Sequence, residues 1–108
     1  MSDRQEKVRT LIKEEVAKEL LRLDLPSLVT VKDVFLTGDF KKAEVWVSIL
    51  NGDETQVLES LNKHIVEIQR VLNSKIVMKF VPKIVFKIDH SRDYAEKIDN
   101  IFKSIEDE

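Results

Sequence analysis

The sequence has 108 residues, of which 43% are hydrophobic and 35% are charged, and its formal net charge is −2. This size and composition are typical of a globular chain, so we expect residues 1–108 to form a single domain around one core. The absence of cysteine excludes a disulfide framework and thiolate chemistry. No apolar stretch approaches the ~20 residues that a membrane span requires. The opening MSDRQEKVR lacks the apolar core of a secretory signal. We therefore expect a cytoplasmic protein that makes no membrane contact.

The first half of the chain predicts a helix followed by two strands. Apolar residues recur at helical spacing over about residues 3–23, and Pro26 ends any continuation of this helix. Residues 28–37 and 43–50 are rich in β-branched residues, which favours two strands joined as a hairpin through residues 38–42. In the first strand the alternation changes phase near Lys32 and Asp33, which predicts a bulge there. The predicted apolar stripe of the helix consists of Val8, Leu11, Ile12, Val16, Leu20 and Leu23.

Two aromatic residues, Phe35 and Trp46, stand at strand positions that alternate away from the predicted core. Val45 and Val47 occupy the inward positions of the second strand, so Trp46 between them faces outward. Exposed rings of this kind either stack on nucleic-acid bases or pack against neighbouring segments. The sequence leaves both alternatives open.

Residues 55–89 predict a helical region that passes into a third strand. Leu61, Ile65, Ile68 and Leu72 recur at spacings of one helical stripe. The pattern then becomes alternating, and Pro82, which cannot donate to a sheet ladder, marks the start of the strand. A further helix is expected over about residues 91–105, from apolar residues at helical spacing. The alternation places lysines on one side of the strand, and on the other it places Ile84, Phe86 and Ile88.

The same stretch carries a local positive charge in an otherwise acidic chain. Residues 62–87 hold six basic residues and one acidic residue, a local charge of +5, so the remaining residues carry −7. Lysines on one side of an element are often only a solvated surface. A basic face on an acidic protein would also orient it on a polyanion, which makes nucleic acid a candidate ligand. The candidate RNA-binding residues are Lys63, His64, Arg70, Lys75, Lys79 and Lys83.

Patterns typical of enzymes are nearly absent from the sequence. The two glycines are isolated, so no phosphate-binding loop is predicted. His64 and His90 do not stand at metal-ligand spacing. Asp89-His90-Ser91 is interpreted as the cap of the helix that follows the third strand. We therefore expect no catalytic residue, no metal, no cofactor and no small-molecule substrate.

Three ordered blocks of the sequence resemble the bacterial ribosome-binding factor A family. RQEKVRTLIKEEVAKEL is similar to its opening helix, LVTVKDVFLTGDFKKAEVWVSIL to its hairpin, and VPKIVFKIDHSRDYAEKIDNIF to its Val-Pro-x-hydrophobic-x-Phe-x-x-Asp-x-Ser block with the following Tyr and Ile-Asp. The resemblance implies an α+β, type II KH-like domain. Its order is helix–strand–strand–helix–kink–helix–strand with a C-terminal helix, and helices cover one face of a three-stranded sheet.

The resemblance also implies a function and a partner. A member of this family is a non-enzymatic assembly factor, here expected to be a monomer. It binds the free small (30S) ribosomal subunit or its precursor and its ribosomal RNA, and assists late maturation of 16S rRNA near the 5′ end.

The family has an Ala-x-Gly kink between its two central helices, which aligns with His64-Ile65-Val66. This chain has neither the alanine nor the glycine. Either the kink persists without them or the helices run more nearly continuously, and the unbroken apolar stripe favours the second.

Two other functions compete with RNA binding. The first is a protein-interaction module of KH-like or ferredoxin-like fold, whose acidic ends dock a protein partner with no direct RNA contact. The second is a small enzyme that uses Asp89 and His90.

Overall fold

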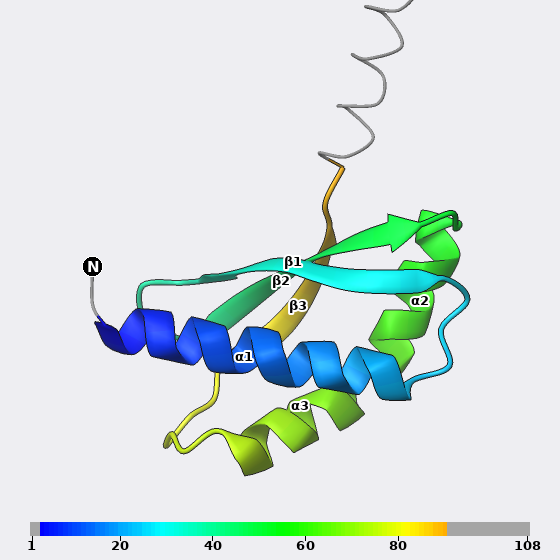
Figure 1. Ribbon diagram of the computed structural model, residues 1–108. Helices are drawn as coiled ribbons and strands as arrows, with labels where there is room; N and C mark the ends of the chain where they lie inside the picture. Colours follow the sequence, from blue (N-terminus) through cyan, green and yellow to red (C-terminus); the bar gives the residue numbers. More distant parts are fainter. Residues whose placement is uncertain (1–2, 91–108) are drawn as a thin grey trace, which may run out of the picture.

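Three helices and a three-stranded sheet make up the computed structural model, which describes residues 3–90 (Figure 1). The order helix–strand–strand–helix–helix–strand confirms the type II KH-like α+β fold. The helix expected over residues 91–105 lies outside the described residues. The elements in chain order are α1 (Asp3–Arg22), β1 (Leu28–Leu36), β2 (Lys42–Leu50), α2 (Glu54–Lys63), α3 (Ile65–Lys75) and β3 (Lys83–Ile88).

The sheet is mixed, with strand order β1-β2-β3. β1 and β2 form the expected antiparallel hairpin, whereas β3 pairs with β2 in parallel. A parallel neighbour needs a long crossover, and α2 and α3 provide it. The register of β1 shifts between Val31 and Asp33, which confirms the predicted bulge. Through this shift Val31 pairs with Val47 and Val34 pairs with Val45, so both phases of the strand bring their valines to the core.

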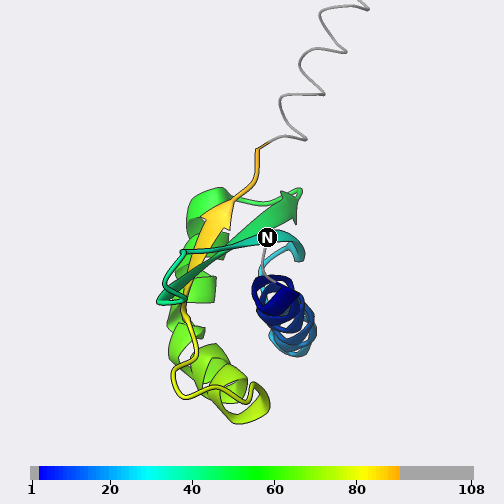
Figure 2. The same cartoon turned by 90° about the vertical axis from the view of Figure 1, so that its left-hand side faces the viewer.

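The core lies between one face of the sheet and the three helices, and Figure 2 shows α1 (blue) and α3 (yellow-green) below the strands. The α1 stripe is buried at Val8, Ile12, Val16 and Leu20. Burying each large aliphatic side chain stabilises the fold by about 1.5 to 3 kcal/mol. Leu11, predicted in the same stripe, is 43% exposed. Neighbouring helix positions point about 100° apart, so Ile12 faces the sheet and Leu11 does not.

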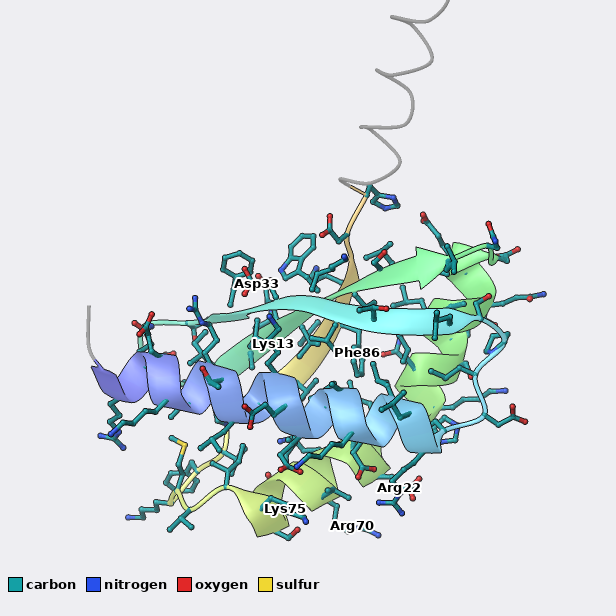
Figure 3. The ribbon with its side chains drawn as sticks, viewed as in Figure 1. Lys13, Arg22, Asp33, Arg70, Lys75 and Phe86 are labelled. Atoms are coloured by element: carbon teal, nitrogen blue, oxygen red, sulfur yellow. The ribbon has the colours of Figure 1, made fainter. Side chains whose placement is uncertain are left out.

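No helix of the described residues covers the opposite face of the sheet. This face carries the rings of Phe35 and Trp46. Phe35 is 51% exposed, and its ring meets that of Trp46 edge to face with centroids 6.3 Å apart. Asp33 lies on this side of the sheet in Figure 3, and Trp46 pairs with Lys87 across the ladder. The outward orientation of both rings is therefore confirmed, and they pack against each other.

No helix in the described part of the chain has the length and apolar character needed to cross a membrane.

Candidate nucleic-acid interface

The helical crossover is divided by a one-residue break at His64. α2 begins at the N-cap Asp53, whose carboxylate accepts hydrogen bonds from the backbone N–H groups of Thr55 at 2.9 Å and Gln56 at 3.2 Å. It ends at Lys63, and α3 begins at Ile65. The two helices run in different directions in Figure 1. The kink thus persists without glycine, and the continuous helix that the apolar stripe favoured is wrong.

The backbone geometry explains why the kink needs no glycine. His64 has φ −97° and ψ 0°, a conformation that ordinary residues reach. Its N–H donates to the carbonyl of Leu61, and its carbonyl accepts the N–H of Ile68 at 3.0 Å, the first hydrogen bond of α3. Leu61, Ile68 and Leu72 are all fully buried across the break. The stripe stays intact because α2 packs on β3 while α3 turns to contact both β3 and α1.

The kink places a carboxylate beside His64. Its Nδ1 lies 3.8 Å from a carboxylate oxygen of Glu67, in the first turn of α3. The positive end of the α3 dipole is therefore already near a negative group, which weakens its attraction for a phosphate. Lys63 is exposed at the last turn of α2. Lys63 and His64 remain predicted RNA contacts at the kink.

A groove of about 330 Å³ runs between α3 and β3. Arg70 stands on its helix side and Lys83 on its strand side, although they are remote in sequence. The remaining lining is mostly apolar or amide in character and comprises Ile65, Val66, Gln69, Asn73 and Ile84.

Gln69 holds the two walls of this groove together. Its Nε2 donates to the carbonyl of Pro82 at 3.0 Å, and its Oε1 accepts the N–H of Ile84 at 2.9 Å. Among the described residues β3 is an edge strand, so within residues 3–90 these backbone groups have no neighbouring strand on that side. The amide of Gln69 takes the place of a strand partner and fixes Lys83 opposite Arg70. Sequence reasoning missed Gln69, because a polar residue at a partly exposed helix position gives no sign of its partners.

A second hollow of about 470 Å³ continues from the groove. It shares Gln69, Asn73 and Lys83 with the groove and adds Lys79. Arg70, Lys79 and Lys83 are thereby brought along one continuous depression. Lys75 lines neither hollow; Figure 3 shows it with Arg70 on α3, both directed away from the sheet.

The basic residues around this depression form no ion pair within the described part of the chain. Arg9, Lys18 and Arg22 of α1 each form an ion pair with a glutamate three residues away. By contrast, residues 3–90 provide no carboxylate partner within ion-pair distance for the lysines and the arginine of the predicted set, which are Lys63, Arg70, Lys75, Lys79 and Lys83. Unneutralised cations along a groove attract a polyanionic chain.

Comparisons with known proteins agree with the resemblance seen in the sequence. The model of the family described as "Ribosome-binding factor A" matches residues 4–102. A ribosome-binding factor A from Pelagibacter ubique is 34% identical over 110 residues, covering 95% of this chain and 90% of its own. One from Bdellovibrio bacteriovorus is 35% identical over 106 residues, covering 93% and 78%.

Solved structures show the same fold. The crystal structure of ribosome-binding factor A from Thermus thermophilus matches with a TM-score of 0.74 at 22% identity, covering 81% of this chain and 97% of its own. A homology model of the T. thermophilus factor, fitted into the cryo-EM map of its 30S complex, matches with a TM-score of 0.67 at 24% identity, covering 76% and 91%. The chain belongs to the ribosome-binding factor A family.

Proposed function

We propose that this chain binds the free small ribosomal subunit or its precursor through ribosomal RNA and assists late maturation of 16S rRNA. It acts as a single, monomeric, non-enzymatic domain of the cytoplasm. The convergence of Arg70, Lys79 and Lys83 on one depression, without carboxylate partners in residues 3–90, is the observation that carries the proposal. Family membership supports it, and so does the relative fitted into a 30S complex.

We expect the residues of the groove and of the second hollow to contact RNA in different ways. Lys79 and Lys83 neutralise phosphates on the strand side, and the guanidinium of Arg70 forks onto a phosphate or stacks on a base. Ile65 and Val66 offer an apolar floor for the flat face of a base. Lys63, His64 and Lys75 extend the contact at the two ends of α3.

Binding of this kind assists maturation without catalysis. A ligand shifts a conformational equilibrium by the difference between its affinities for the two states. If the factor holds one arrangement of the precursor RNA more tightly than the others, that arrangement becomes more populated. Processing enzymes and later assembly proteins then meet the RNA in the form that they require.

Sedimentation of cell extract tests the proposal. The protein should travel with free small subunits rather than with assembled ribosomes. The double variant Lys79→Glu/Lys83→Glu should move to the top of the gradient, because two attractive charges become repulsive. Lys32→Glu is the matched control, since Lys32 is exposed on β1 and β2 lies between that strand and β3.

The outcome also separates RNA binding from protein docking. If the double variant still sediments with small subunits as well as the unaltered protein does, RNA contact at this depression is excluded. A protein-interaction module that docks through other surfaces would give that result.

A further inference from the structure

The loop between α3 and β3, residues 76–82, presents apolar side chains to solvent. Phe80 is 77% exposed and Val77 is fully exposed, whereas Met78 and Val81 of the same loop pack against the core. The loop is therefore anchored from beneath while Phe80 projects outward. An anchored, exposed aromatic ring is the kind of surface on which a ligand stacks.

A third hollow, of about 510 Å³, lies on the far side of this loop. Phe80 and Lys79 line both this hollow and the second one, so the depression that begins between α3 and β3 continues around the loop. The third hollow is completed by Arg4 of α1 and by Phe40 and Lys41 of the β1–β2 hairpin. These three segments meet at the end of the molecule that Figure 1 shows on the left.

Basic residues predominate along this extension. Arg4, Lys41 and Lys79 line the third hollow, with Asp39 as its acidic residue. Asp39 accepts hydrogen bonds from the Thr37 hydroxyl at 2.7 Å and from the Lys41 N–H at 3.1 Å. Lys41 Nζ lies 4.0 Å from the other carboxylate oxygen of Asp39. The hydrogen bond from Thr37 lowers the pKa of Asp39, so this carboxylate is ionised but already engaged.

Cations also lie close to the rings of Phe80 and Phe40, the two aromatic residues that line the third hollow. Lys79 Nζ is 5.7 Å from the centroid of the Phe80 ring, and the Arg4 guanidinium carbon is 5.6 Å from that of Phe40. A ring beside an ammonium matches a nucleotide, because the ring stacks on the base and the ammonium pairs with the phosphate.

We propose that Phe80 is a base-stacking platform for an unpaired nucleotide of RNA, and that the strand continues from the α3–β3 groove past Lys79 to Lys41 and Arg4. This inference rests on the proposed function and adds a recognition site to it. It assigns the factor a preference for single-stranded RNA, since a base already stacked in a duplex has no free face for Phe80.

Fluorescence anisotropy with a labelled 12-nucleotide single-stranded RNA of mixed sequence, and with the same strand annealed to its complement, tests the site. In the full chain, Phe80→Ala should weaken single-strand binding at least about fivefold, the lower bound for one base stacked on an aromatic ring. Phe80→Leu should lose as much and Phe80→Tyr should bind like the unaltered protein, because the aromatic face is what matters. Duplex affinity should be equal in all of them.

Val77→Ala is the matched control, since Val77 is in the same loop and lines none of the three hollows. It should bind both RNAs as the unaltered protein does. A second measurement uses Phe80→Trp in a Trp46→Phe background, which leaves a single indole at the site. Single-stranded RNA should quench its fluorescence, and duplex RNA should not.

Arg70→Glu distinguishes failure of this site from failure of the proposed function. If Arg70→Glu weakens RNA binding and Phe80→Ala does not, RNA binding stands and the stacking site is excluded. If neither variant weakens RNA binding, both proposals fail. If Phe80→Ala weakens binding to purified small subunits but not to RNA, the loop contacts a protein, and the stacking proposal is overturned.

Discussion

At the scale of single residues, the turn between β2 and α2 shows how two adjacent positions carry different constraints. Asn51 has a positive φ of 53°, a left-handed conformation that asparagine tolerates. Gly52 has no positive φ, yet a Cβ there would overlap the Ser27 side chain, with Ser27 Cβ 2.7 Å away. The glycine is therefore required for space, and the asparagine for backbone conformation.

Gly52→Ala should lower the free energy of unfolding by about 1 to 3 kcal/mol, the usual cost of forcing an extra carbon into a packed contact. Gly38→Ala is the control, because its Cβ would meet no atom within 4 Å and its φ is not positive. That change should be neutral or stabilise by up to about 1 kcal/mol through the unfolded state. Urea denaturation followed by the fluorescence of Trp46 measures both, and equal stabilities would contradict the steric argument.

Gln69→Leu should destabilise the protein by about 1 to 3 kcal/mol, because the N–H of Ile84 and the carbonyl of Pro82 lose their shared partner. Gln56→Leu, at an exposed position of α2, should change stability by less than about 0.5 kcal/mol. The same urea experiment compares them. A loss below about 0.5 kcal/mol for Gln69→Leu would mean that water replaces the amide at the edge of β3.

At the scale of elements, α2 and α3 behave as two helices that share one buried stripe. The break at His64 leaves α2 only ten residues long, which is too short to be stable by itself. Its stability therefore depends on packing against β3 and on the cap at Asp53. The cap supplies two hydrogen bonds to backbone N–H groups that the helix cannot satisfy internally.

Asp53→Ala should accordingly cost about 0.5 to 2 kcal/mol of stability. Asp53→Asn keeps a capping oxygen and should recover most of this loss. Thermal unfolding monitored by circular dichroism compares the three proteins. An alanine variant that melts with the unaltered chain would show that packing alone holds the first turn of α2.

At the scale of the whole molecule, the separation of charge should govern affinity. The chain has a net charge of −2, but residues 62–87, which form the end of α2, all of α3, the loop that follows and most of β3, carry +5. Binding driven by phosphate contacts releases counterions and weakens steeply with salt.

The logarithm of the association constant for small subunits should fall linearly with the logarithm of salt concentration, by about 0.7 to 0.9 for each phosphate contact. Lys79→Ala and Lys83→Ala should each reduce the steepness by about that amount, because each variant removes one contact. Lys32→Ala should leave it unchanged. A titration between low and moderate salt measures the slopes, and an affinity independent of salt would rule out the electrostatic mechanism.

Local patterns were enough to determine most of the architecture of this protein. Helical spacing located the buried face of α1, and β-branched alternation located the hairpin. The phase change at Lys32 and Asp33 located the bulge, because side-chain direction in a strand follows directly from residue order. The charge imbalance pointed to a polyanionic ligand, and the resemblance of the three blocks to the family implied the small ribosomal subunit as the expected partner, before any spatial arrangement was known.

Only the tertiary structure decided how the crossover bends and what its side chains meet. A single residue with φ −97° and ψ 0° breaks the helix without disturbing the apolar spacing, so the sequence pattern passes through the kink unchanged. The contact of Gln69 with Pro82 and Ile84, and the meeting of Phe80 with the hairpin and the start of α1, join residues that lie far apart in the chain. Such contacts depend on how the elements pack together, and this packing leaves no periodic pattern in the sequence.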